Sequence, residues 1–420
     1  MREDPLTWIS GGAEQRTAAQ RVRRGAQLPA VGLVFIGLVV VGCGSESGDP
    51  DVEGTVTNAS SPAQTSASVA PVTLDEATRS QLDATFNEAF AATGMLGGAA
   101  WITIGADEWR AVAGVDDPAS GAPFDPDGNV RIASITKTFA ATAVLMLVDA
   151  GKVALDDPLE KYVEGIANGD TVTVRDLLAM TSGVWDFTSD EAFVARFDAD
   201  PMLPWTPEQT VDLIRQHGPD FAPGEQVVYC DSNYVLLGLI LEQATGLTAS
   251  EAINTMVVDP LGLDATLFPA PDQPGVPEPA TSGYLPPPEG TEAPPTLVGD
   301  INPQWAWTAG NMTSNMTDLH RWAAELADGS LLDPATQAER LDSQRFTGQQ
   351  VNLAYGLGVL TLNDLIGHNG AIIGYSTAVF RYPQADATFV IVGNESTNET
   401  TPTLDIFFSL LRQLYPDQIS

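Results

Sequence analysis

The chain has 420 residues, and 44% of them are hydrophobic, which is enough to bury the core of one large domain or of two ordinary ones. With 55 acidic and 19 basic side chains, its formal net charge is −36. A surface this negative repels nucleic acid and anionic lipid headgroups, so neither is expected as a ligand of the folded part, and the charge itself favours solubility.

The N-terminal residues have the pattern of an export signal. Arginines at positions 21, 23 and 24 precede an apolar run over 28–41, which is too short for a comfortable membrane span. The run ends in Gly42-Cys43, which resembles a bacterial lipoprotein signal, and this resemblance implies that Cys43 is lipidated and becomes the mature N-terminus. A short, uncleaved transmembrane anchor is the alternative. Both interpretations place the rest of the chain outside the cytoplasmic membrane.

A flexible tether is predicted next, because residues 45–71 are rich in Ser, Thr, Ala, Gly and Asp and show no apolar period. We therefore divide the chain into a signal peptide (1–42), a tether (43–71) and a folded domain (72–420). The protein is expected to be extracytoplasmic, either lipid-anchored to the cell membrane or secreted. The N-terminal lipid anchor is the one membrane contact expected.

The folded domain opens with a helix and two strands. Apolar residues spaced by four predict an amphipathic helix over 74–92. Two short strands are predicted over 98–104 and 109–115. Residues 135–148 are almost wholly apolar, and a helix that is apolar all round belongs in the middle of a domain.

The rest of the domain alternates between helical and strand patterns. Residues 155–267 are mainly helical in pattern, and residues 269–303 are dense in proline and glycine and predict a long loop. The remaining elements are a helix over 313–327, strands over 354–362, 366–369, 377–382 and 388–392, and a final helix over 402–415. Strands from both ends of the chain can form one antiparallel sheet, with the terminal helices on one face and a helical insertion at about 155–300 beside the other. This is an α+β architecture.

Ser134-Ile135-Thr136-Lys137 carries the first catalytic pattern, S-x-x-K. Ser134 lies where the buried helix is predicted to begin, and unpaired N–H groups and the helix dipole favour a developing anion there. Lys137, one turn on, can reach the serine hydroxyl, and a desolvated lysine can take its proton. The alternative is a capping serine beside a stray lysine, but a lysine in so apolar a helix is costly without a partner.

Two further segments lie at predicted element boundaries. Tyr229 precedes an apolar helix and can share a proton with Lys137; a core-packed tyrosine is the alternative. His368 ends a short strand beside Gly370, where glycine lets a substrate approach the backbone; a structural histidine is the alternative. Cys230, the neighbour of Tyr229, is expected to be a small buried packing residue.

In their order, S-x-x-K, Y-x-x and H-x-G resemble the penicillin-recognising serine hydrolase family, and in particular the branch that holds class C β-lactamases, D-alanyl-D-alanine carboxypeptidases and related esterases. The resemblance runs from about Leu74 to the C-terminus. Secondary matches occur at Arg175-Asp176-Leu177-Leu178 through Thr181-Ser182-Gly183, Asn233-Tyr234 through Leu237-Gly238, Tyr355-Gly356-Leu357-Gly358, and Gly374-Tyr375-Ser376.

The resemblance implies a β-lactamase/transpeptidase-like fold and a role for each motif. Ser134 is acylated, Lys137 and Tyr229 relay its proton, and the backbone N–H groups of Ser134 and Ala371 form the oxyanion hole. His368 takes the place often held by a lysine. The residues expected to bind substrate are Asp231, His368, Asn369, Gly370 and Ala371.

Two positions depart from the family's pattern. Asp231 stands where the second motif usually has asparagine, and an ionised aspartate only accepts hydrogen bonds. It also holds Lys137 more firmly protonated, which shifts the role of base toward Tyr229. Asn369 stands where a threonine commonly helps to bind a substrate carboxylate, and His368 is mostly neutral near pH 7. Recognition of a free C-terminal carboxylate is therefore expected to be weak, which leaves room for esters.

The motifs together predict an acyl-transfer serine hydrolase of the cell envelope, D-alanyl-D-alanine carboxypeptidase-like or β-lactamase-related. We expect a monomer acting on D-alanyl peptides, β-lactams or small esters. The alternatives are an esterase of the same fold and an inactive envelope binding or sensor lipoprotein. A conventional serine triad is disfavoured because the sequence has no G-x-S-x-G elbow. No cofactor is expected, and no metal, since the sequence shows no cluster of His, Cys and carboxylate ligands.

Overall fold

The computed structural model describes residues 71–199, 202, 204–272, 275–286, 294–298, 302–346, 352–396 and 401–419. The chain divides into two units, Met1–Phe35 and Ile36–Ser420, and all the described residues belong to the second. The predicted signal peptide, Cys43 and nearly all of the predicted tether therefore lie outside the described residues. Among the helices of the described part, none has the length and hydrophobicity needed to cross a membrane.

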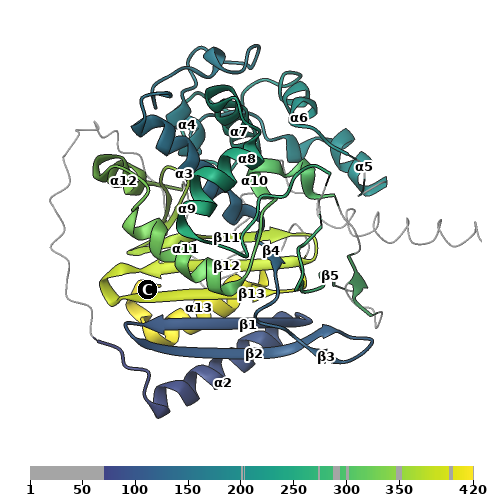
Figure 1. The fold of residues 1–420 in the computed structure, drawn as a ribbon, viewed down its shortest axis with the longest axis vertical. Helices are drawn as coiled ribbons and strands as arrows, with labels where there is room; N and C mark the ends of the chain where they lie inside the picture. The colour runs from purple at the N-terminus through teal and green to yellow at the C-terminus, as the bar shows by residue number, and fades with distance from the viewer. Residues whose placement is uncertain are drawn as a thin grey trace, which may run out of the picture. The chain divides into compact units, whose positions relative to one another are not determined.

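A nine-stranded antiparallel sheet is the centre of the described part (Figure 1). Strands from the two ends of the domain meet in it, because β1 pairs with β13 and places Trp101 opposite Val390. The strands, in sheet order, are β3 (Ala122–Pro123), β2 (Asp107–Asp117), β1 (Gly97–Ile104), β13 (Ala387–Gly393), β12 (Tyr375–Tyr382), β11 (Leu365–Ile372), β10 (Leu360–Leu362), β9 (Leu353–Tyr355) and β8 (Gln344–Arg345). Two short pairs lie outside it: β4 (Val130–Arg131) with β7 (Thr313–Ser314), and β5 (Tyr284–Leu285) with β6 (Thr296–Leu297).

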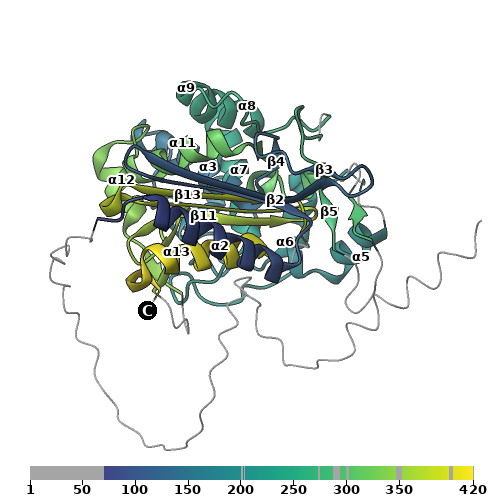
Figure 2. The same ribbon diagram turned by 90° about the horizontal axis from the view of Figure 1, so that it is seen from below.

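Helices cover both faces of the sheet. The terminal helices α2 (Glu76–Thr93) and α13 (Pro402–Leu414) pack on each other and on one face, and α11 (Met316–Asp328) packs on the other (Figure 2). Beyond α11 lie α3 (Thr136–Asp149), α10 (Trp307–Gly310) and the helices of the inserted region: α4 (Val174–Leu178), α5 (Glu191–Ala199), α6 (Pro207–Ile214), α7 (Asp231–Thr245), α8 (Ala249–Ile253) and α9 (Asp259–Leu261). The α+β architecture predicted from the sequence is confirmed.

Helix α3 is held in the core by α11 and α12 (Pro334–Leu341). The Phe139 ring stacks on Trp322 with centroids 3.8 Å apart, and the Trp322 indole N–H donates to the Thr138 hydroxyl at 2.7 Å. The buried Arg340 guanidinium donates to the Thr138 carbonyl at 3.3 Å. Since buried polar groups are costly unless bonded, these contacts fix the position and rotation of α3.

Some predicted boundaries are wrong. The single strand over 354–362 is a hairpin of β9 and β10, because Gly356–Gly358 turns between them. The helix predicted from Thr313 begins at Met316, where the Asn315 side chain accepts from the Asp318 N–H, and α12 was not predicted. The described part of the predicted loop over 269–303 includes β5 and β6.

Gly358 shows why this turn needs glycine. Its φ is +85°, and a Cβ added there would lie 2.1 Å from the Ala141 Cβ on α3. By contrast, Gly151 has φ +66° with nothing within 4 Å of such a Cβ. The two glycines thus share the left-handed backbone but differ in the space around them.

We expect Gly358→Ala to lower the free energy of unfolding by at least about 3 kcal/mol, because backbone strain and overpacking add. Gly151→Ala, which introduces backbone strain alone, should cost roughly 1–2 kcal/mol. Urea denaturation of both variants measures the difference. Equal losses at the two positions would mean that α3 and the 356–358 turn do not pack as described.

Candidate active site

Ser134 lies in a short 3-10 turn, η1 (Ala133–Ile135), just ahead of α3 rather than at its first residue. Ala133 has a φ of 47°, a region that non-glycine residues rarely adopt. Ile132, which precedes Ala133, is hydrogen-bonded through both of its backbone polar groups. Its N–H donates to the Met312 carbonyl at 3.0 Å, and its carbonyl accepts from the Thr377 hydroxyl at 3.2 Å. These bonds hold the strained turn in place.

Lys137 follows one turn later, and its side chain is fully buried. Three acceptors surround its three N–H groups: the Ser134 hydroxyl at 3.1 Å, the Ala309 carbonyl at 2.7 Å and the Asp231 carboxylate at 2.6 Å. Burial by itself lowers the pKa of a lysine, but Asp231 and Tyr229 outweigh it and hold the pKa of Lys137 above its ordinary value. The resting lysine is therefore an ammonium.

Tyr229 covers this ammonium, with Nζ 4.9 Å from the centre of its ring. The hydroxyl is buried and forms no hydrogen bond of normal geometry among the described residues, although Lys137 and Ser134 lie near enough to lower its pKa through weak hydrogen bonding. Burial raises the pKa of Tyr229 to about 12, against the opposing charge of Lys137. The resting site thus holds a neutral phenol with unused hydrogen-bonding capacity.

Asp231, the first residue of α7, has a second carboxyl group behind it. Asp186 accepts from the Asp231 N–H at 3.0 Å, and from the N–H and hydroxyl of Thr188 at 3.1 and 3.0 Å. Burial, and after it the charge of Asp231, raise the pKa of Asp186 to about 7. One carboxyl group, that of Asp231, therefore binds the lysine, and a second, that of Asp186, lies next to Asp231.

His368, on β11, is buried, and both of its ring nitrogens are used inside the protein. Nδ1 donates to the Asn369 carbonyl at 2.5 Å, so Nε2 accepts from the Tyr355 hydroxyl at 3.2 Å. Its ring centre lies 6.1 Å from that of Tyr229. Burial, together with the charge of Lys137, lowers the pKa of His368 to about 3. His368 therefore supplies a neutral wall of the site and no cation.

The end of β11 lies against the turn that carries Ser134. A Cβ added at Gly370 would lie 2.3 Å from the Ile132 carbonyl, so only glycine permits this approach. β10 pairs with β11 only as far as Gly367, which leaves the later edge of β11 unpaired by it. Asn369 and Ala371 are partly exposed there.

The structure brings Ser134, Lys137, Tyr229 and Asp231 together from separate segments, with His368 behind Tyr229. Cys230 is buried, and its thiol donates to the Val184 carbonyl at 3.3 Å, as a packing residue would.

Two residues that hydrogen-bond to the site, Asp186 and Ala309, were not predicted from the sequence. Asp186 is one of 55 acidic residues, and only its place shortly after the Thr181-Ser182-Gly183 match could have drawn attention to it. Ala309 acts through its backbone carbonyl, which no side-chain pattern reveals.

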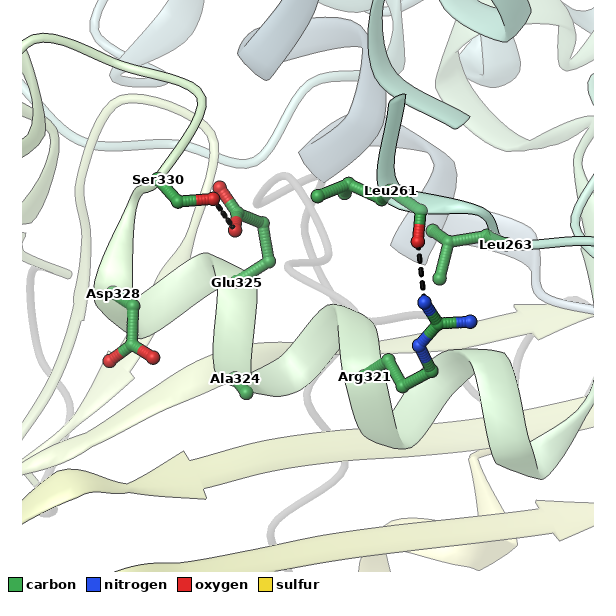
Figure 3. Close-up of a pocket in the computed structure, with 7 residues that line it drawn as sticks. All are labelled: Leu261, Leu263, Arg321, Ala324, Glu325, Asp328 and Ser330. Carbon is green, nitrogen blue, oxygen red and sulfur yellow. Dashed lines mark hydrogen bonds between the residues drawn. The ribbon is translucent and has the colours of Figure 1, made fainter. Parts of the chain in front are cut away.

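Two surface cavities lie away from this site. The one in Figure 3 has a volume of about 220 Å³, and several of its polar side chains are bonded within the protein: Arg321 donates to the Leu261 carbonyl at 2.6 Å, and Ser330 donates to Glu325 at 2.6 Å. The other, of about 460 Å³, lies between Tyr162 and Gln243. In the described part of the chain, no group of three or more His, Cys, Asp or Glu residues is arranged to hold a metal ion.

Comparison with known proteins gives a family match. The sequence profile of the Beta-lactamase family matches residues 82–411. Penicillin-binding protein 4 of Amycolatopsis lactamdurans is 29% identical over 273 residues, which cover 61% of this chain and 65% of that protein. This chain spans less than two thirds of the length of the first curated relatives it matches.

Solved structures agree with the architecture. A D-stereospecific amidohydrolase from Streptomyces sp. is 30% identical, with a TM-score of 0.70 over 81% of this chain and 98% of that chain. An octameric penicillin-binding protein homologue from Pyrococcus abyssi is 25% identical, with a TM-score of 0.68 over 79% of this chain and 76% of that chain. The β-lactamase/transpeptidase-like fold implied by the sequence motifs is confirmed.

We expect the His368 imidazole to stay neutral between about pH 5 and pH 8, because burial and the nearby Lys137 charge disfavour its protonation. NMR of ¹⁵N-labelled histidine should show ring signals that do not titrate and that correspond to a protonated Nδ1. A His368→Gln variant assigns the signals. A midpoint near the ordinary histidine pKa would contradict the geometry.

Proposed function

The chain belongs to the beta-lactamase family, and from this membership we propose that it is a serine hydrolase that acts through an acyl-enzyme on Ser134. The single observation that carries the proposal is the 3.1 Å bond between Lys137 Nζ and the Ser134 hydroxyl in a buried site. The unpartnered Tyr229 hydroxyl beside them supplies a second group that can move a proton. These intact groups weigh against the inactive sensor alternative.

In the proposed acylation step, the Ser134 oxygen attacks the substrate carbonyl carbon and its proton leaves. Because the resting Lys137 is an ammonium bound to Asp231, Tyr229 is the better placed relay: its oxygen takes the serine proton while its own proton passes to the leaving group. The carbon–nitrogen or carbon–oxygen bond of the substrate then breaks. Lys137 stabilises the negative charge that develops on Ser134 and Tyr229.

We assign the oxyanion hole to the backbone N–H groups of Ser134 and Ala371. The assignment is supported by the approach of Gly370 to the Ile132 carbonyl and by the unpaired edge of β11 beyond Gly367. In deacylation, a water molecule attacks the acyl carbon and gives up a proton, which the Tyr229 relay passes to the Ser134 oxygen. The bond to Ser134 breaks, and the serine regains its proton.

For substrates, we propose D-alanyl peptides, β-lactams, and small esters or amides, in carboxypeptidase-like or β-lactamase-related hydrolysis. The named relatives support this range, since one is a penicillin-binding protein and another a D-stereospecific amidohydrolase. The neutral, buried His368 favours esters and amides over peptides that end in a carboxylate, because it offers that carboxylate no charge.

We also propose that the enzyme works as a monomer outside the cytoplasmic membrane, tethered through a lipid on Cys43 or secreted. Support for the location comes from the sequence pattern alone, because Cys43 lies outside the described residues. The octameric relative makes the oligomeric state a matter for direct measurement by light scattering.

The acyl-enzyme is tested by mass spectrometry after exposure to a penicillin and to an activated D-alanyl ester. We expect an adduct on Ser134 that Ser134→Ala and Lys137→Ala abolish, while Lys152→Ala, which removes an exposed lysine, retains it. A long-lived penicillin adduct indicates a peptidase, and a short-lived one a β-lactamase. Absence of both adduct and turnover would count against the proposed function.

Asp231→Asn tests which group is the base. Without the carboxylate, burial dominates, so the pKa of Lys137 should fall by on the order of 1–3 units. A lysine must be neutral to accept a proton, so the pH–rate profile of acylation by an N-acylated anilide should shift to lower pH and the rate at pH 7 should rise. Stopped-flow kinetics measure both, with exposed Asp170→Asn as the matched control. An unchanged profile would mean that Lys137 never serves as the base.

A further inference from the structure

The Asp231 carboxylate offers a substrate only hydrogen-bond acceptors, whereas the asparagine usual at this position of the motif would also offer a donor. Lys137 is bonded to one carboxylate oxygen, Oδ1, and within the described residues no donor is bonded to the other. The Asp231 side chain keeps 26% of its surface exposed, whereas Lys137 has none. A carboxylate repels a substrate carbonyl oxygen, but it binds N–H donors and binds cationic ones best.

The Asp231 carboxylate and the Ser134 hydroxyl are neighbours across Lys137, which makes the carboxylate a candidate partner for a substrate amine. The Ser134 hydroxyl and the Asp231 carboxylate share Lys137 Nζ, at 3.1 and 2.6 Å, so they lie close together. In an amino acid derivative, the α-nitrogen is two bonds from the carbonyl carbon. A carbonyl placed over Ser134 therefore leaves its α-nitrogen within reach of Asp231. The buried, unpartnered Tyr229 hydroxyl lies in the same space.

The charges of the cluster formed by Lys137, Asp231 and Asp186 can be balanced by one more cation. Lys137 carries one positive charge, and Asp231 and Asp186 provide two carboxyl groups. The other titratable groups near Asp186 are the Cys230 thiol and, beyond Asp231, Lys137 on α3. When Asp186 is ionised, the cluster is one positive charge short, and a substrate ammonium would balance it.

We propose that Asp231 is a specificity-determining residue that binds a protonated amine on the acyl side of the substrate, so that amino acid amides and esters with a free α-amino group are preferred over their N-acylated forms. Asp186 is a positioning residue in this scheme: it holds the Asp231 backbone and adds the second negative charge. The inference rests on the proposed function, since it concerns the acyl group that Ser134 receives.

The test compares D-alanine p-nitroanilide with N-acetyl-D-alanine p-nitroanilide, which share a leaving group and differ at the amine. For the wild type, we expect kcat/KM to favour the free amine by roughly 30-fold or more. Asp231→Asn should lower this ratio at least about 10-fold, mainly through KM, while Asp170→Asn keeps it. A wild-type preference for the acetylated substrate, or a ratio that Asp231→Asn leaves unchanged, overturns the inference.

p-Nitrophenyl acetate, which has no amine, distinguishes a failure of the proposed function from a failure of the proposed amine specificity. If its turnover does not depend on Ser134, the proposed function fails and the inference fails with it. If its turnover depends on Ser134 but neither anilide is hydrolysed, or the anilide ratio is unaffected by Asp231→Asn, only the inference fails.

The role of Asp186 has its own readout. Burial and the charge of Asp231 place the pKa of Asp186 at about 7, and a bound cation favours its ionised form. KM for the free amine should therefore fall as pH rises from about 5.5 to about 7.5, a range in which the α-amino group stays mostly protonated. Asp186→Asn should flatten this dependence. A KM independent of pH in the wild type overturns the charge assigned to Asp186.

Discussion

The site depends on the burial of one ammonium ion. Removing a lysine from water costs several kcal/mol unless its charge and each N–H are matched. Three acceptors bind the Lys137 ammonium: the Ser134 hydroxyl one turn earlier, the carboxylate of Asp231 at the start of α7, and the carbonyl of Ala309, 172 residues away in α10. Because these acceptors belong to different elements, satisfying the lysine also fixes α7 and α10 relative to α3. The contacts that offset the free-energy cost of burying Lys137 are thus the same contacts that orient it toward Ser134.

The sheet supplies a hydrogen-bonded edge against the turn that carries Ser134. The turn that carries Ser134 contains a non-glycine residue in a left-handed conformation, which persists only where the surroundings hold it. The holding contacts come from β12, through the Thr377 hydroxyl, and from β11, through the close approach of Gly370. Sheet and helical region therefore meet at one short turn, and the proposed reaction takes place where they meet.

The sequence identified the side chains that meet at the candidate site better than the groups that support them. The motifs at Ser134, Tyr229 and His368 use side chains whose chemistry is specific. The hydrophobic pattern located the longer sheet strands and the buried helix, but not the two-residue strands β3 and β8. Asp186 could not be singled out because so many carboxylates share its type, and Ala309 acts through its backbone. The sequence predicts one strand where β9 and β10 form a hairpin, because both halves are apolar and the turn between them depends on tertiary packing against α3.

Asp231 connects the base and the specificity of the site. Its carboxylate is the partner that keeps Lys137 protonated, so any group that competes for it weakens that hold. A substrate ammonium bound to Asp231 would be such a competitor, and its own positive charge would further disfavour the charged form of Lys137. Binding of the preferred substrate would then lower the pKa of Lys137 and make a second base available beside the Tyr229 relay. An N-acylated substrate has no such effect, so the site could discriminate in rate as well as in affinity.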